Sequence, residues 1–277
     1  MTARGGRHGV DVAAVTGLVE HVARTVVAPR FRDLVAGEVR EKSPGDLVTV
    51  VDTEAEAALT AGLQAIAPGV PVVGEEATAE RPELLDLLAD APRAWVVDPL
   101  DGTQAFVDGS PDHAVMVALV EHGECVAGWI CLPEHGETYV AERGSGAFRN
   151  GERLTRAAAP ADPASLRGGL AVRYLPVALR DRLVRAAADR LPGLTVEDRL
   201  WSGFEYARLA SGVHDVALYW RTWPWDHAPG AVLLRELGGS SRRLDGSDYR
   251  PGRAGEGLLL AADHGTEVLV RDLLGLT

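Results

Sequence analysis

Residues 95–103 read WVVDPLDGT, an apolar run that ends in two aspartates three positions apart. The run predicts a buried strand that delivers Asp98, while Pro99 restricts φ and Asp101 follows at the start of a helical turn. Two carboxylates at one strand end repel each other unless a cation lies between them. Hard oxygen ligands suit Mg²⁺, and the turn also exposes the carbonyl oxygen of Leu100. The stretch therefore predicts a metal site.

Gly102 and Thr103 follow the second aspartate directly. Their backbone N–H groups are expected at the N-terminus of the next helical turn, where the helix dipole favours a bound phosphate. The alternative for the pattern Asp-Pro-x-Asp-Gly-Thr is a simple capped turn. The acidic motifs elsewhere in the chain favour the metal and phosphate site over that alternative.

Three further motifs each place a carboxylate at an element boundary. The stretch VVGEEAT puts Glu75 and Glu76 after a short apolar strand, although glutamate pairs are also common on surface loops. GDLVTVVDTEAE places Asp52 before a helix, either as a carboxylate that favours the dipole or as a hydrogen-bond partner of Thr103. WPWDHAPGA sets Asp226 at the start of an apolar helix, where an N-cap is the alternative role. His227 is interpreted as structural.

The remaining patterns predict an α/β chain. The helix that follows Asp52 is expected to use Thr53 as its N-cap and Glu56 to complete a capping box. Short β-branched runs predict a sheet, and Asn150-Gly151 predicts a hairpin. Without repeats or linkers, residues 1–277 should form one globular unit with a metal-binding α+β half at about 1–158 and an α/β half at about 159–277. Helices are expected over 11–35, 53–66, 177–189, 203–211, 226–237 and after 263, and strands over 94–100, 113–120, 124–132, 137–140, 215–220 and 257–261.

The net charge of −12 argues against a nucleic-acid surface, because phosphate backbones are held by clustered Lys and Arg. A metal cation is the more natural partner. Cys125 and Cys131 have no accompanying zinc ligands and are predicted to be buried small hydrophobes. No apolar run approaches a membrane span, and MTARGGRHGVDVAA at the N-terminus lacks a signal-like core. A cytoplasmic protein with no membrane or nucleic-acid partner is expected.

The motifs DLVTVVD, GEE, DPLDGT and WDHAPGA, in this order, resemble the inositol monophosphatase superfamily across nearly the whole chain. The resemblance implies a layered α/β/α/β/α sandwich of the inositol monophosphatase and fructose-1,6-bisphosphatase type, assembled as a homodimer. It also implies a Mg²⁺-dependent, lithium-sensitive phosphatase. Its substrate would be a phosphate monoester of a small polyol, sugar or related metabolite, hydrolysed by a metal-activated water.

The resemblance also assigns site residues. It implies that Glu75, Asp98 and the Leu100 carbonyl hold a first Mg²⁺, and that Glu75 reaches a third. Asp98, Asp101 and Asp226 would hold the second. Thr103, oriented by Asp52, would position the attacking water together with Glu75. Residues implied on the substrate side are Gly102 and Thr103, for the phosphate, and Ser202 and Gly203.

The chain departs from the family pattern before the Trp-Asp motif. Many sugar-phosphate members carry an acidic residue six or seven places earlier, where this chain reads Leu218-Tyr219-Trp220-Arg221. Tyr219, Trp220 and Arg221 are therefore predicted to select another alcohol, one with a second anionic group for Arg221. The alternative is a buried strand that ends in a surface arginine. Lys42 matches the usual family lysine only loosely and is given no role.

Three functional alternatives remain at this stage. A histidinol-phosphate or nucleoside-bisphosphate phosphatase would share every metal ligand and differ only in the substrate wall. A non-catalytic metal-binding relative is disfavoured because clustered carboxylates are costly without a cation. An RNA- or partner-binding scaffold is disfavoured by the acidic charge and the lack of a basic stripe.

Overall fold

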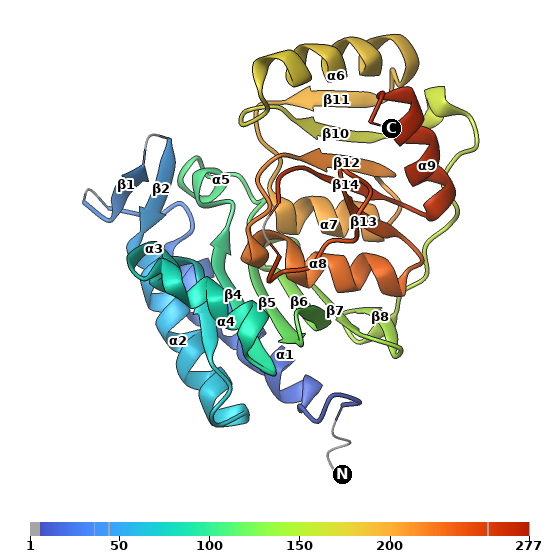
Figure 1. Ribbon diagram of the computed structural model, residues 1–277. Coiled ribbons are helices and arrows are strands. Elements are labelled where there is room, and N and C mark those ends of the chain that lie inside the picture. The colour runs from blue at the N-terminus through green and yellow to red at the C-terminus, as the bar shows by residue number, and fades with distance from the viewer. Residues whose placement is uncertain (1–5, 36, 44, 254, 277) are drawn as a thin grey trace.

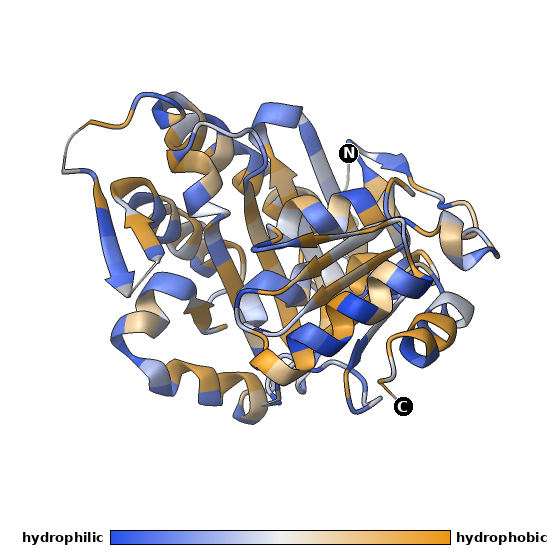
Figure 2. Ribbon diagram, turned by 90° about the horizontal axis from the view of Figure 1, so that it is seen from above, coloured by the Kyte–Doolittle hydropathy of each residue, from blue (hydrophilic) through white to orange (hydrophobic). Residues whose placement is uncertain are grey.

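The computed structural model describes residues 6–35, 37–43, 45–253 and 255–276. Two large sheets alternate with helices, so that the layers run helix, sheet, helix, sheet, helix (Figure 1). This arrangement confirms the predicted α/β/α/β/α sandwich. Hydrophobic residues are concentrated in the strands between the helical layers (Figure 2). Residues 1–5, the start of the N-terminal stretch that was predicted to lack a signal-like core, lie outside the described residues.

The first large sheet has seven strands in the order β3-β4-β5-β6-β7-β8-β9. β3 and β4 are parallel, and the other neighbours are antiparallel. Both faces are covered, because Trp95 and Val97 of β4 pack in one core while Val96 packs in the other. Its strands are β3 Val72–Gly74, β4 Arg93–Asp101, β5 Ala114–Glu121, β6 Glu124–Leu132, β7 Glu137–Glu142, β8 Gly146–Arg149 and β9 Glu152–Arg153.

Helices α1 (Val12–Val22) and α2 (Val50–Ile66) pack against one face of this sheet. α1 continues through a π-helical turn, Ala23–Val27, and a 3-10 turn, Ala28–Arg30. The sequence predicted no run that approaches a membrane span, but the segment Val12–Arg30 has the length and apolar composition of one. Val15 and Val19 are fully buried in the shared core, so one face of this segment packs against the sheet.

The predicted start of α2 is wrong. The helix begins at Val50 and its N-cap is Thr49, whose capping box is completed by Asp52. Thr53 and Glu56 have the same spacing, but both lie inside the helix. The earlier pair forms the cap because Asp52 can reach the backbone N–H of Thr49, at 2.8 Å, while Glu56 contacts a different helix.

The middle layer consists of α7 (Ser202–Ala210) and α8 (Pro224–Glu236), which lie between the two sheets (Figure 1). The second large sheet has the order β11-β10-β12-β14-β13, and β10 runs parallel to both β11 and β12. Helices α6 (Val177–Arg190) and α9 (His264–Leu273) cover its outer face. The strands are β10 Gly168–Ala171, β11 Leu194–Glu197, β12 Val216–Tyr219, β13 Ser240–Arg243 and β14 Leu258–Ala261.

The smaller elements complete the description. A two-stranded sheet of β1 and β2 stands beside the site, and short helices connect the strands. The Asn150-Gly151 hairpin is confirmed, with φ of 50° and 79° at its two residues. Both cysteines are buried, as predicted. The remaining elements are β1 Val39–Ser43, β2 Asp46–Thr49, α3 Glu75–Glu80, α4 Leu87–Asp90, α5 Thr103–Val107 and four 3-10 turns at Pro82–Asp86, Pro133–His135, Pro163–Ser165 and Ala28–Arg30.

Candidate functional site

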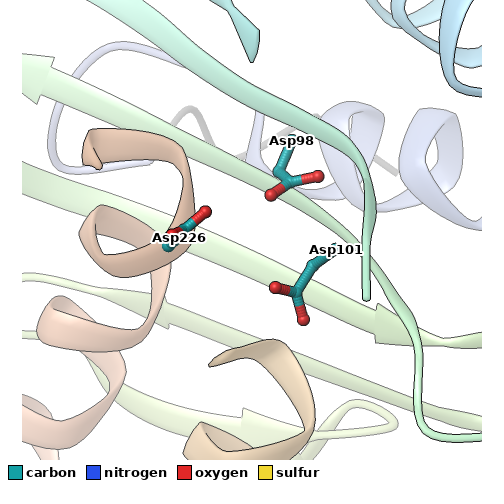
Figure 3. A group of neighbouring side chains, drawn as sticks. All are labelled: Asp98, Asp101 and Asp226. Carbon is teal, nitrogen blue, oxygen red and sulfur yellow. The ribbon is translucent and has the colours of Figure 1, made fainter. Parts of the chain in front are cut away.

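Three aspartates converge where β4 ends beside α8. Asp98, Asp101 and Asp226 each offer a carboxylate oxygen, and these oxygens all lie within 4.8 Å of one another. Figure 3 shows the three side chains turned toward a common point. Asp101 is the last residue of β4. The prediction that it starts a helical turn is therefore wrong. Asp226 lies in the first turn of α8, so it is not the N-cap.

The cluster is electrostatically demanding. Removal from water raises the pKa of Asp98 well above its usual value, and the neighbouring Glu75, Asp101 and Asp226 carboxylates raise it further. The pKa of Asp226 is raised in the same way. Only hard oxygen donors converge here, which is the donor set that a divalent cation such as Mg²⁺ takes. The residues present therefore fit a metal site.

Asp101 is held by the middle layer. Its carboxylate accepts hydrogen bonds from the Ser202 hydroxyl at 2.7 Å and from the backbone N–H of Gly203 at 2.8 Å. These bonds oppose the rise in the pKa of Asp101 that burial causes. Of the two residues predicted on the substrate side, Ser202 lines the cavity beside the cluster, whereas Gly203 is not among the residues that line it and donates to Asp101.

Glu75 begins α3, directly after the short strand β3. Glu56 of α2 accepts hydrogen bonds from the N–H groups of Glu76 and Ala77, both at 2.8 Å, and so caps this helix. Gly74 leaves room for this contact, because a Cβ there would lie 2.4 Å from the Glu56 carboxylate and would displace it. The glycine before the two glutamates thus allows α2 to bind the first turn of α3, the helix that carries Glu75.

Lys42 is the site residue that sequence reasoning missed. Its Nζ lies 2.9 Å from Glu75 Oε1 and also pairs with Glu76. Lys42 comes from β1, and strand spacing does not reveal that β1 approaches α3. One signal was available, because Lys42 is the only lysine in a chain that otherwise uses arginine. The compact ammonium group of lysine fits between two carboxylates, whereas the planar guanidinium of arginine is larger.

Asp52 is a hydrogen-bond partner of Thr103, which is one of the two roles that the sequence allowed for it. The Thr103 hydroxyl lies 3.0 Å from Asp52 Oδ1 and 3.1 Å from the Leu100 carbonyl oxygen. Asp52 Oδ2 accepts from the Thr49 N–H and hydroxyl. Asp52 therefore fills both roles, because one oxygen caps α2 and the other faces Thr103. Gly102, with φ of 80°, makes the turn that brings Thr103 there.

These groups share one cavity of about 400 Å³. The metal-ligand candidates and Gly102 and Thr103 line one part of it, and Tyr219, Trp220 and Arg221 line another. His227 is buried outside this lining, where its Nε2 lies 3.2 Å from the Arg221 carbonyl oxygen. Burial lowers the pKa of His227 to about 4, so the ring stays neutral in the core. The arrangement can bind cations beside a polar wall.

Comparisons with known proteins agree with the fold. Residues 10–273 match the inositol monophosphatase family. An inositol-1-monophosphatase from Mesorhizobium japonicum is 35% identical over 212 residues, which cover 76% of each chain. A histidinol-phosphatase from Chlorobaculum parvum is 34% identical over 237 residues, or 83% of each chain. The extragenic suppressor protein SuhB from Bartonella henselae superposes with a TM-score of 0.79 at 27% identity, covering 95% of this chain and 98% of that one.

Proposed function

Because the chain belongs to the inositol monophosphatase family, we propose that it is a Mg²⁺-dependent phosphatase that hydrolyses a phosphate monoester of a small polyol, sugar or related metabolite. The observation that carries this proposal is the convergence of Asp98, Asp101 and Asp226, with oxygens within 4.8 Å. Clustered carboxylates of this kind suit ions that bind phosphate oxygens.

The proposed metal ligands are those of the family pattern. Glu75, Asp98 and the Leu100 carbonyl would hold one ion, and Asp98, Asp101 and Asp226 a second, with Glu75 available to a third. Mg²⁺ bound there would lower the pKa of water and neutralise charge on the phosphate oxygens. The chain's own residues supply the positions: β4 carries Asp98, and the hydrogen bonds from α7 restrict Asp101.

Thr103 is proposed to position the attacking water. Its hydroxyl can donate to Asp52 Oδ1, 3.0 Å away, which leaves an oxygen lone pair free to accept a hydrogen bond from a water in the cavity. Asp52 is itself fixed by Thr49, so the orientation of the Thr103 hydroxyl is set before substrate binds. Glu75 completes the water site. The N–H groups of Gly102 and Thr103 are proposed to hold the phosphate beside it.

The family resemblance supports three further parts of the proposal. Lithium would inhibit turnover, the chain would form a homodimer, and the protein would be cytoplasmic. Cys125 and Cys131 are free thiols, which agrees with a reducing compartment. Sedimentation velocity would measure the oligomeric state, and a monomer at micromolar concentration would contradict the homodimer.

The first test is phosphate release from inositol, sugar, histidinol and nucleotide monoesters, with and without Mg²⁺ and then with added Li⁺. We expect turnover that requires Mg²⁺ and falls with Li⁺. Histidinol phosphate or a nucleoside bisphosphate as the best substrate would select the alternative within the family. A protein that binds Mg²⁺ but releases phosphate from none of these compounds would contradict the proposal and favour a non-catalytic relative.

Asp98→Asn tests the site directly. The change keeps the side-chain shape and removes the charge that both ions would share, so phosphate release should fall by at least about 100-fold. Circular dichroism should show an unchanged fold, and the Mg²⁺-induced rise in Tm should shrink. Asp181→Asn, on the outer helix α6, is the control and should leave turnover intact. Full activity of the Asp98 variant would refute the assignment.

A further inference from the structure

Three arginines lie at equivalent positions at one edge of the second sheet. Arg173, Arg199 and Arg221 each follow the last residue of β10, β11 and β12 by two positions. These three strands are adjacent and parallel, so their carboxyl ends meet at the same edge. All three arginines line the cavity that contains the aspartate cluster. The carboxyl edge of parallel strands is where α/β sheets bind ligands.

Direct ion pairs involve only two of these three guanidinium groups. Asp198 lies 3.1 Å from Arg173 and 3.8 Å from Arg199, and its side chain is largely exposed. Arg199 also donates to the carbonyl oxygen of Gly45. Within the part of the chain that the structure describes, Arg221 has no carboxylate at ion-pair distance. One guanidinium at the cavity wall is therefore available to an anionic ligand.

Arg221 is held in place by an aromatic ring. Its guanidinium carbon lies 4.0 Å from the centroid of the Tyr174 ring, and Arg173 lies 5.7 Å from the same centroid. Stacking fixes the plane of a guanidinium and leaves its N–H edge free for two parallel hydrogen bonds to a carboxylate or phosphate. Tyr174 and Trp223 remain about 40% exposed and line this cavity, so an apolar wall surrounds the charge.

Tyr219 links the arginine to the aspartate cluster. It lines the same cavity, two residues before Arg221, and its hydroxyl is buried with no hydrogen-bond partner among the described residues. A buried hydroxyl without a partner is unfavourable, and an oxygen of a bound ligand would satisfy it. Tyr219 lies where the family pattern described above has an acidic side chain, which would repel a second anion. Here the side chain is neutral.

We infer that the alcohol part of the substrate carries a second anionic group, a phosphate or carboxylate, which Arg221 binds while the monoester lies at the aspartate cluster. This inference rests on the proposed phosphatase function and narrows its substrate class. The second group stays on the alcohol product, because only the monoester at the cluster is hydrolysed. Arg173 adds charge from the next strand, and the Tyr219 hydroxyl contacts the part of the substrate between the two anions.

The test compares matched pairs of phosphate monoesters that differ only in the second anion. The pairs are adenosine 2′-monophosphate with adenosine 2′,5′-bisphosphate, and fructose 1-phosphate with fructose 1,6-bisphosphate. We expect kcat/KM in at least one pair to be about 10- to 100-fold higher for the bisphosphate, the range of a hydrogen bond to a charged group. The product should be the alcohol with the second phosphate retained.

Arg221→Met keeps the stem on Tyr174 and removes the charge, so the preference within that pair should fall to about one. Because Arg221 also lowers the pKa of Asp226, turnover itself can change, and the ratio within one variant cancels that effect. Arg221→Lys should restore part of the preference. Arg180→Met, an arginine outside the cavity, is the control. Thermal unfolding checks that each variant is folded.

The outcomes separate the two proposals. Hydrolysis of the monophosphates with no preference for either bisphosphate, or a preference that Arg221→Met leaves unchanged, would overturn the second-anion inference and leave the phosphatase function standing. Phosphate release from none of the four compounds and from none of the wider panel above would overturn both, whereas release from the wider panel alone would overturn only the second-anion inference.

Discussion

At the scale of single residues, Lys42 places a positive charge between two carboxylates of the acidic site. Burial disfavours its charged form, but Glu75 and Glu76 outweigh that effect and raise the pKa of Lys42. The ammonium group therefore stays charged and holds α3 near β1. It also occupies one oxygen of Glu75, a proposed metal ligand. Lys42 and a divalent cation should consequently compete for the same carboxylate.

Lys42→Met tests this competition. Without the ammonium group, Glu75 and Glu76 repel each other, so Tm in EDTA should fall by about 5 °C. The Mg²⁺-induced rise in Tm should be larger than in the wild type, and half-saturation should need less Mg²⁺. Arg40→Met, which removes an exposed positive charge from the same strand, is the control. An unchanged Mg²⁺ titration in the Met variant would show that the lysine does not compete.

At the scale of secondary-structure elements, the junction between β4 and α5 controls the site. Asp98 and Asp101 end the strand, and Thr103 begins the helix after a single residue, Gly102. The φ of 80° at Gly102 is unfavourable for any residue with a Cβ. A Cβ there would also lie 3.1 Å from the Asp112 carbonyl oxygen. The turn is therefore both strained for other residues and closely packed.

Gly102→Ala should lower the free energy of unfolding by about 1–2 kcal/mol, because the left-handed conformation is unfavourable for alanine. The accompanying shift of Thr103 should lower kcat by about tenfold or more, since small misplacements near the reacting group are costly. Gly212→Ala is the matched control: its φ is 76° with no atom within 4 Å of a Cβ. It should lose similar stability and keep its activity. Equal kcat in both variants would contradict the prediction.

At the scale of the whole molecule, the aspartate cluster joins the layers. Asp98 and Asp101 come from the seven-stranded sheet, and Asp226 comes from the helix layer between the sheets. Desolvation raises the pKa of Glu76 to about 8 and of Glu75 to about 7, and repulsion adds to both rises, from Glu75 and Asp52 on Glu76 and from Asp52 and Asp46 on Glu75. Folding thus brings together negative charges that the unfolded chain keeps apart.

The stability of the protein in EDTA should therefore fall as pH rises from 6.5 to 8. In this range the folded state binds more protons than the unfolded chain, where glutamate titrates near 4.5, so raising the pH favours unfolding. Each proton that the folded state binds in excess of the unfolded chain lowers the free energy of unfolding by about 1.4 kcal/mol per pH unit. Below pH 6.5 the buried His113 and His227, whose pKa values are lowered to about 4, act in the opposite direction.

Thermal unfolding at pH 6.5, 7.2 and 8.0, with EDTA or with Mg²⁺, measures this dependence. Mg²⁺ should raise Tm most at pH 8, where the carboxylates are charged and available to bind it. Asp98→Asn should reduce both the decline in EDTA and the Mg²⁺ effect. A Tm in EDTA that stays constant or rises over this range would contradict the electrostatic description of the site.

Features that depend on local pattern were predictable from sequence. The apolar run of β4 and the turn residues after it predicted a strand that ends in two carboxylates, because a short run of this kind bounded by turn residues is typical of a buried strand. The start of α2 was not predictable in this way. Thr49 with Asp52 and Thr53 with Glu56 satisfy the same capping pattern, and only the position of α3 beside Glu56 distinguishes them.

Features that join distant segments required the fold. No spacing in the sequence places Lys42 on Glu75, or Asp101 under the N–H of Gly203, because these contacts depend on which elements pack together. Likewise, the three arginines after β10, β11 and β12 lie tens of residues apart and meet only because those strands are parallel neighbours. Local sterics set the elements of this protein, and long-range packing placed the charges that its chemistry would use.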